Sequence, residues 1–225
     1  MSAKQIFQKY PYIVVEGPIG SGKTTLAKKL AERFQVNLLL EKAEENPFLE
    51  RFYRDMPRYA LPAQLHFLFQ RAQQLQDLTQ QDIFGDAFVA DFFIEKDPLF
   101  ARINLADDEF DLYQTIYQKM RLQASQPSLV IYLQTPVEEL LTRVEERNIQ
   151  YEQSISRDYL AKLAQAYSEF FHNYASSPLL IVNNEKLNIL TSEEAMELLI
   201  DRIMQMQSQR EFFNPNLDWA LVQQW

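Results

Sequence analysis

Nine residues near the start of the chain have the types and spacing that hold a phosphate group. They read Gly17-Pro18-Ile19-Gly20-Ser21-Gly22-Lys23-Thr24-Thr25 and fit the pattern G-x-x-x-x-G-K-[ST]. Backbone N–H groups of such a loop, with the helix N-terminus behind it, cradle phosphate oxygens. Lys23 would then reach the β- and γ-phosphates, and the Thr24 hydroxyl would ligate Mg²⁺. Three of the four glycines of the chain lie here, which disfavours an accidental match. This P-loop (residues 17–25) predicts nucleotide binding and leaves kinase, GTPase and ATPase open.

Two carboxylates follow short apolar segments and are candidates for chemistry beside the P-loop. Glu41 comes directly after the run 37–40, where it could accept the proton of an attacking hydroxyl. Asp91 ends the run 88–91, where an acid could bind Mg²⁺. The competing interpretations are a solvated acidic turn for Glu41 and a helix N-cap or turn residue for Asp91.

The segments that must position these groups alternate between short apolar runs and longer helical patterns. Five runs read as strands: 12–16, 37–40, 88–91, 129–133 and 179–182. This alternation predicts an α/β fold with a parallel five-stranded sheet and helices on both faces. Ligands of such sheets bind beyond the carboxyl ends of the strands, and the first run leads straight into the P-loop.

Composition limits the classes of partner. A chain of 225 residues with a formal net charge of −9 disfavours nucleic acid or an anionic membrane as a main partner. Cysteine is absent, so disulfides and thiolate chemistry are excluded. Neither an export signal nor a membrane-spanning run is recognisable, so we expect the cytoplasm.

One domain accounts for most of the length. We assign residues 1–209 to it and residues 210–225 to a C-terminal extension rich in aromatic residues. The extension carries Phe212, Phe213, Trp219 and Trp225, so we expect it to dock onto the domain or onto a partner chain.

The order of motifs resembles the deoxynucleoside kinase family, which includes deoxyadenosine, deoxyguanosine and deoxycytidine kinases. The resemblance runs from about Tyr12 to about Leu187. Its landmarks are the P-loop, Glu41 with Asn46-Pro47-Phe48, Phe52-Tyr53, Gln64, Arg71 and an arginine-rich lid ending at Glu152. It implies a P-loop kinase fold with an arginine-bearing lid, ATP and Mg²⁺ as cofactors, and a homodimer formed beside the stretch 64–79.

The resemblance also implies roles for residues that the bare sequence leaves ambiguous. Glu41 becomes the general base that activates the 5′-hydroxyl, and Tyr53 and Glu152 hold the 3′-hydroxyl. Gln64 and Arg71 correspond to the residues that recognise the nucleobase, and Phe100 to an aromatic side chain that stacks on it. Without the resemblance, Gln64 and Arg71 would read as a polar helix stripe and Phe100 as core.

Two arginines of the lid are spaced to share one helix face. Arg143 and Arg147 lie four residues apart, and the resemblance implies that they close on the phosphates of ATP. The competing interpretation is an exposed helical ion pair between Glu139 and Arg143, which would contribute only a few tenths of a kcal/mol.

One position departs from the family pattern. The family has an acid-Arg-Ser motif after the third strand, whereas this chain reads Ala90-Asp91-Phe92-Phe93. Asp91 keeps the carboxylate, but the arginine is missing; Lys96 or the lid would have to supply its charge. One residue further on, Asp97 matches an aspartate that reads the base.

These observations predict an enzyme that transfers the γ-phosphoryl group of ATP to the 5′-hydroxyl of a deoxynucleoside in nucleotide salvage, with purine deoxynucleosides preferred. Its catalytic residues would be Lys23, Glu41, Asp91, Arg143 and Arg147. A nucleoside-monophosphate kinase and a non-catalytic nucleotide-binding protein of the same fold are the alternatives.

Overall fold

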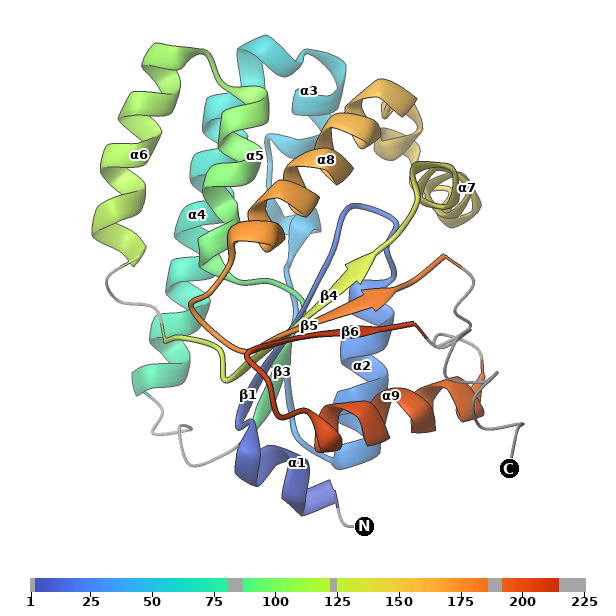
Figure 1. The fold of residues 1–225 in the computed structure, drawn as a ribbon. Helices are drawn as coiled ribbons and strands as arrows, with labels where there is room; N and C mark the ends of the chain where they lie inside the picture. The colour runs from blue at the N-terminus through green and yellow to red at the C-terminus, as the bar shows by residue number, and fades with distance from the viewer. Residues whose placement is uncertain (1–2, 81–86, 122–124, 186–191, 215–225) are drawn as a thin grey trace.

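A parallel β-sheet forms the centre of the chain in the computed structural model, which describes residues 3–80, 87–121, 125–185 and 192–214. Within these residues the sheet has six strands in the order β2-β3-β1-β4-β5-β6, and all neighbouring pairs are parallel (Figure 1). The strands are β1 (Tyr12–Glu16), β2 (Asn37–Leu39), β3 (Phe88–Ala90), β4 (Leu129–Gln134), β5 (Leu179–Asn183) and β6 (Arg210–Phe213). The predicted α/β class is confirmed, and five strands lie where the apolar runs predict them.

The sheet has six strands rather than the predicted five, and the additional strand, β6, lies at one edge. β6 forms the start of the segment that we assign to the C-terminal extension, and it pairs with β5. An edge strand needs only one buried face, so a four-residue strand with a polar first half gives a weak signal. Its two aromatic residues point to opposite sides: Phe213 is 2% exposed, whereas Phe212 is 67% exposed. Trp219 and Trp225 lie outside the described residues.

Helices cover both faces of the sheet. The α-helices are α1 (Ala3–Lys9), α2 (Lys23–Phe34), α3 (Leu49–Arg54), α4 (Met56–Gln80), α5 (Asp97–Asn104), α6 (Asp107–Arg121), α7 (Val137–Arg147), α8 (Arg157–Asn173) and α9 (Glu193–Gln205). The short 3₁₀ helices are η1 (Ala43–Glu45), η3 (Ile94–Lys96) and η4 (Gln150–Ser154). None of the described helices is long and apolar enough to cross a membrane.

Alternate residues of the strands pack into two separate cores. On β1, Ile13 and Val15 face the core formed with α1, α2 and α9. Tyr12 and Val14 face the other core, to which α8 contributes side chains such as Phe171. Because both faces are covered, every residue of β1 is buried, which explains its continuous apolar run.

A third layer of helices has a hydrophobic core of its own. Helices α3, α4, α5 and α6 share a separate hydrophobic cluster that includes Phe52, Leu68 and Tyr113. This layer places α4 beside the segment that follows β2. Residues of α3 and α4 line a cavity together with residues that follow β1, β2 and β3.

The contribution of β6 to stability can be measured with its two aromatic residues. Phe213→Ala removes a buried side chain from the core, so we expect the free energy of unfolding to fall by about 3 kcal/mol. Phe212→Ala, the matched control on the exposed side, should change it by less than about 0.5 kcal/mol. Equal effects of the two variants in urea unfolding would contradict the packing of β6.

Candidate active site

A cavity of about 260 Å³ opens at the carboxyl ends of β1, β2 and β3. This volume lies just below the usual range for small-molecule sites, roughly 300–1,000 Å³. The lining residues that the sequence predicts for the site are Ile19, Lys23, Thr24, Glu41, Tyr53, Gln64, Arg71, Asp91, Phe100, Arg147 and Glu152. Residues far apart in the sequence thus meet around one space, as the family resemblance implies.

The P-loop connects β1 to α2 in a conformation that depends on glycine. Gly20 and Gly22 have φ angles of 85° and 86°, in the left-handed region that other residues rarely adopt. A Cβ atom on Gly20 would also lie 2.7 Å from the carbonyl oxygen of Leu140 in α7. The amide of Asn184, after β5, donates to the carbonyl oxygen of Ser21 at 2.8 Å. Gly22 precedes the first residue of α2, so the positive end of the helix dipole lies at the loop.

Asp91 links the P-loop helix to the segment after β2. Its Oδ2 accepts a hydrogen bond from the Thr24 hydroxyl at 2.5 Å, and its Oδ1 accepts one from the backbone N–H of Glu41 at 2.7 Å. A hydroxyl and a carboxylate side by side are oxygen ligands that suit Mg²⁺. Among the described residues, no group of three or more histidine, cysteine, aspartate or glutamate side chains is arranged to hold a metal ion. A metal here would therefore need phosphate or water oxygens as further ligands, as Mg²⁺ in phosphoryl-transfer sites does.

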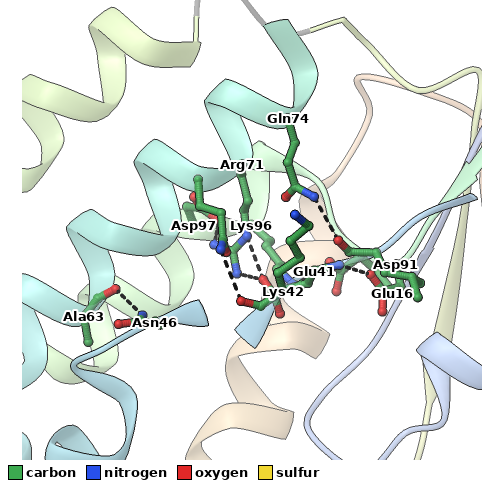
Figure 2. Close-up of polar contacts among 12 residues, drawn as sticks. Glu16, Glu41, Lys42, Asn46, Ala63, Arg71, Gln74, Asp91, Lys96 and Asp97 are labelled. Carbon is green, nitrogen blue, oxygen red and sulfur yellow. Dashed lines mark hydrogen bonds and ion pairs between the residues drawn. The ribbon is translucent and has the colours of Figure 1, made fainter. Parts of the chain in front are cut away.

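The segment 40–46 that carries Glu41 is fixed to α4 at both ends (Figure 2). The side-chain amide of Gln74 donates to the carbonyl oxygen of Leu40 at 3.0 Å. Further along, the amide of Asn46 donates to the carbonyl oxygen of Ala63 at 3.1 Å. The Asn-Pro-Phe turn recognised in the sequence therefore has a structural role: it holds the segment against α4.

Arg71 of α4 bridges two carboxylates. Its Nε donates to Glu41 Oε1 at 2.8 Å, and its Nη2 pairs with the same oxygen. Its Nη1 pairs with Asp97, which is 1% exposed at the start of α5. Figure 2 shows the three side chains in contact. Asp97 does not line the cavity itself and contacts it through Arg71.

The charges around Glu41 keep it ionised. Burial alone would raise its pKa, but Arg71, Lys96 and Lys23 outweigh burial and lower the pKa to about 2. A carboxylate that is ionised at neutral pH can accept a proton. Asp97 behaves in the opposite way, because burial raises its pKa to about 7 against the attraction of Arg71 and Lys96.

Aromatic side chains form part of the cavity wall. The ring of Tyr53 stacks on that of Tyr151, with 5.8 Å between ring centroids and 15° between planes. Beside them Glu152 is buried and pairs with Arg147 of α7. Gln64 is buried on α4, and Phe100 lines the cavity from α5.

Arg143 lies at the P-loop rather than in the cavity. Its Nη1 donates to the carbonyl oxygen of Ser21 at 3.4 Å, and its Nη2 donates to that of Asn184 at 3.3 Å. The ion pair with Glu139 that the sequence offers as the alternative is also present, at 3.4 Å. A position at the P-loop is compatible with contact to a bound phosphate.

Thr25, the last residue of the P-loop, is exposed on α2 and does not line the cavity.

Several residues of the site carry no clear signal in the sequence. The cavity is also lined by Tyr151, Phe67 and Tyr159. Glu16, the residue before Gly17 of the P-loop, is buried. For Tyr151, the sequence indicates a place in the site only through its neighbour Glu152. Lys96, considered above as a source of positive charge, is 1% exposed and lines the cavity.

Comparison with known proteins identifies the family. A family model described as deoxynucleoside kinase matches residues 13–208. The chain belongs to the deoxynucleoside kinase family. The deoxyguanosine kinase of Bacillus subtilis is 34% identical to this deoxynucleoside kinase over 158 residues, covering 70% of this chain and 76% of the relative. The deoxyadenosine/deoxycytidine kinase of the same organism is 30% identical over 203 residues, covering 87% and 92%.

Solved structures agree with the fold of this deoxynucleoside kinase. The structure of deoxyadenosine kinase from M. mycoides with bound dCTP superimposes with a TM-score of 0.74 at 23% identity. The alignment covers 87% of this chain and all of that one. This likeness confirms the predicted P-loop kinase fold.

The raised pKa of Asp97 predicts a pH dependence of nucleoside binding. Raising the pH from about 6 to about 8 ionises Asp97, whose charge then orients Arg71 more firmly, so the KM for the nucleoside should fall a few fold. Glu41, with a pKa of about 2, stays ionised over this interval and adds no change. Asp97→Asn should have a high KM that does not vary with pH. The exposed Asp77→Asn on α4 is the control and should keep the wild-type profile; a pH-dependent KM in Asp97→Asn would contradict the assignment.

Proposed function

We propose that this enzyme transfers the γ-phosphoryl group of ATP to the 5′-hydroxyl of a deoxynucleoside, preferring purine deoxynucleosides, as a step of nucleotide salvage. The observation that carries the proposal is the position of an ionised Glu41 between the P-loop and the helical layer. Its backbone is bonded to Asp91 and its side chain to Arg71. A base held between a phosphate loop and an aromatic pocket suits the activation of a hydroxyl for attack on phosphorus.

In this reaction the 5′-oxygen attacks the γ-phosphorus while the bond to the β-phosphate oxygen breaks, and Glu41 accepts the hydroxyl proton. The bonds from Arg71 go to Oε1 of Glu41, which favours Oε2 as the proton acceptor. Lys23 and the backbone N–H groups of the P-loop bind the ATP phosphates, and Arg143 and Arg147 add positive charge from α7. Thr24 and Asp91 would hold Mg²⁺, which neutralises phosphate charge when bound.

The nucleoside occupies the part of the cavity lined by aromatic side chains. Tyr53 and Glu152 bind the 3′-hydroxyl, and Phe100 stacks on the base. Gln64 presents one donor and one acceptor group to the edge of the base, next to Arg71. The names of both Bacillus subtilis relatives include a purine deoxynucleoside, which supports the purine preference.

Glu41→Gln tests the assignment of the base. The amide keeps the shape of the side chain but is a very weak proton acceptor, so kcat should fall by about 10²–10⁴ while the KM for the nucleoside changes little. Glu45→Gln changes an exposed acid of the same segment and is the control; it should keep wild-type rates. A kcat of Glu41→Gln close to that of the wild type would exclude Glu41 as the base.

The same assay, run with deoxynucleosides, ribonucleosides and nucleoside monophosphates, identifies the acceptor. We expect turnover of one or two deoxynucleosides, with purines ahead. Faster turnover of monophosphates would favour a nucleoside-monophosphate kinase. ATP binding without turnover of any acceptor would favour a non-catalytic nucleotide-binding protein.

We also propose a homodimer formed through α4 and α6. These neighbouring helices carry two of the large apolar side chains that remain exposed among the described residues, Phe69 at 49% and Leu112 at 52%. Exposed apolar residues on adjacent helices favour a protein interface. Light scattering at micromolar concentration should give twice the chain mass for the wild type and the monomer mass for Phe69→Asp with Leu112→Asp. A wild-type monomer would contradict the proposal.

A further inference from the structure

A buried lysine outside the family's motifs lies in the wall of the cavity. Lys96 ends η3, and its side chain is 2% exposed. Its Nζ lies 2.7 Å from Oε1 of Glu16 and 5.8 Å from the ring centroid of Phe100. It lines the same cavity as Lys23 and Glu41.

Glu16 connects this lysine to the P-loop. Glu16 is the last residue of β1 and is fully buried. Its Oε2 accepts hydrogen bonds from the backbone N–H of Gly17 and from the hydroxyl of Tyr167, both at 3.0 Å. Lys96 pairs with Glu16, and Glu16 accepts a hydrogen bond from Gly17. These two interactions fix the position of the Lys96 ammonium group relative to the P-loop.

Stability alone is a weak reason for this arrangement. Transfer of a lysine and a glutamate from water to a protein interior costs free energy that their attraction often fails to return. Replacement of such a pair by apolar residues is often neutral or stabilising. The pair also borders a cavity, where a ligand can interact with the ammonium group.

The arrangement of cations around the cavity favours an anionic ligand. Lys23 and Lys96 line the same cavity. Two ammonium groups that destabilise each other in the free protein are both stabilised when a phosphate group binds near them. Lys96 in turn keeps its charge, because Glu16 and Glu41 raise its pKa against the effect of burial.

We propose that Lys96 is a catalytic residue of this kinase, whose ammonium group binds the phosphoryl group during its transfer, and that Glu16 and Tyr167 are positioning residues that hold it. Lys96 gives up no proton in this role; it supplies fixed positive charge at the site where negative charge moves. It would replace the charge of the arginine that is missing after Asp91. This assignment rests on the proposed function.

The competing explanation is that Lys96 serves as a counter-ion for Glu16. The two explanations differ in what happens when both charges are removed. If Lys96 were a counter-ion, loss of Glu16 would remove the need for it. If Lys96 binds the phosphoryl group, activity stays low whether or not Glu16 is charged.

The experiment compares Lys96→Met with the double variant Glu16→Gln, Lys96→Met. Methionine is an apolar side chain of similar length, and the Glu16→Gln change retains a side-chain carbonyl oxygen that can accept from Gly17. We expect Lys96→Met to lower Tm, because it leaves a buried carboxylate unpaired, and to lower kcat by about 10²-fold or more. The double variant should recover the wild-type Tm but keep the low kcat, with little change in the KM for the nucleoside. Arg102→Met, the control, removes an exposed arginine of α5 and should keep wild-type Tm and kcat.

Each outcome decides the proposal. A double variant whose kcat returns to within a few fold of the wild type would reduce Lys96 to a counter-ion and overturn the assignment. If Lys96→Met alone does not fold, the double variant, which lacks both buried charges, carries the test. Wild-type turnover is measured first on the deoxynucleoside panel. Its absence overturns the proposed function as well, whereas wild-type turnover with an active double variant overturns the role of Lys96 alone.

Discussion

The hydrogen bonds of Asp91 join the three segments from which the phosphate side of the site is built. One carboxylate oxygen accepts from Thr24 at the start of α2, and the other accepts from the backbone of Glu41. The backbone N–H of Asp91 donates to the carbonyl oxygen of Leu39 at 3.2 Å, which continues the pairing of β3 with β2. The position of the proposed base relative to the P-loop therefore depends on one side chain at the end of β3. A parallel sheet makes this possible because the strands end at the same edge.

From Glu41 to α4 and α5, negatively and positively charged side chains alternate. Glu41, Arg71 and Asp97 form one buried chain, and Lys96 with Glu16 forms another beneath the P-loop. In a medium of low dielectric constant each cation stabilises its neighbouring carboxylates, and an unpaired group would be costly. The low pKa of Glu41 and the raised pKa of Asp97 follow from their places in this network. Two carboxylates on one guanidinium thus titrate in different pH ranges.

The sequence predicts the parts of the fold and site that local patterns encode. Strands β1, β3, β4 and β5 are almost entirely buried and give continuous apolar runs. The edge strand β2 is more exposed but is also apolar, so five of the six strands were recognisable, and the acids after β2 and β3 follow from their positions. The edge strand β6 lacks such a run. The contacts of Arg71 with Glu41 and Asp97 join residues 30 and 26 positions apart, and tertiary packing alone determines them. The sequence matches Asp97 to an aspartate that reads the base, whereas the structure shows Asp97 paired with Arg71 and outside the lining of the cavity.

Lys96 illustrates a limit of motif comparison. Glu16 reads as the last residue of a strand, and Lys96 lies in a stretch, Ile94-Glu95-Lys96-Asp97, that resembles a solvated turn. Packing under α8, where Tyr167 contacts Glu16, makes both charges buried and brings them together. A lysine carries a compact charge on a flexible chain, so it can deliver that charge to a cavity from a different backbone position than an arginine would use. Phosphoryl transfer therefore requires a positive charge at a given place in the cavity. The acid-Arg-Ser motif is one of several sequences that can supply this charge.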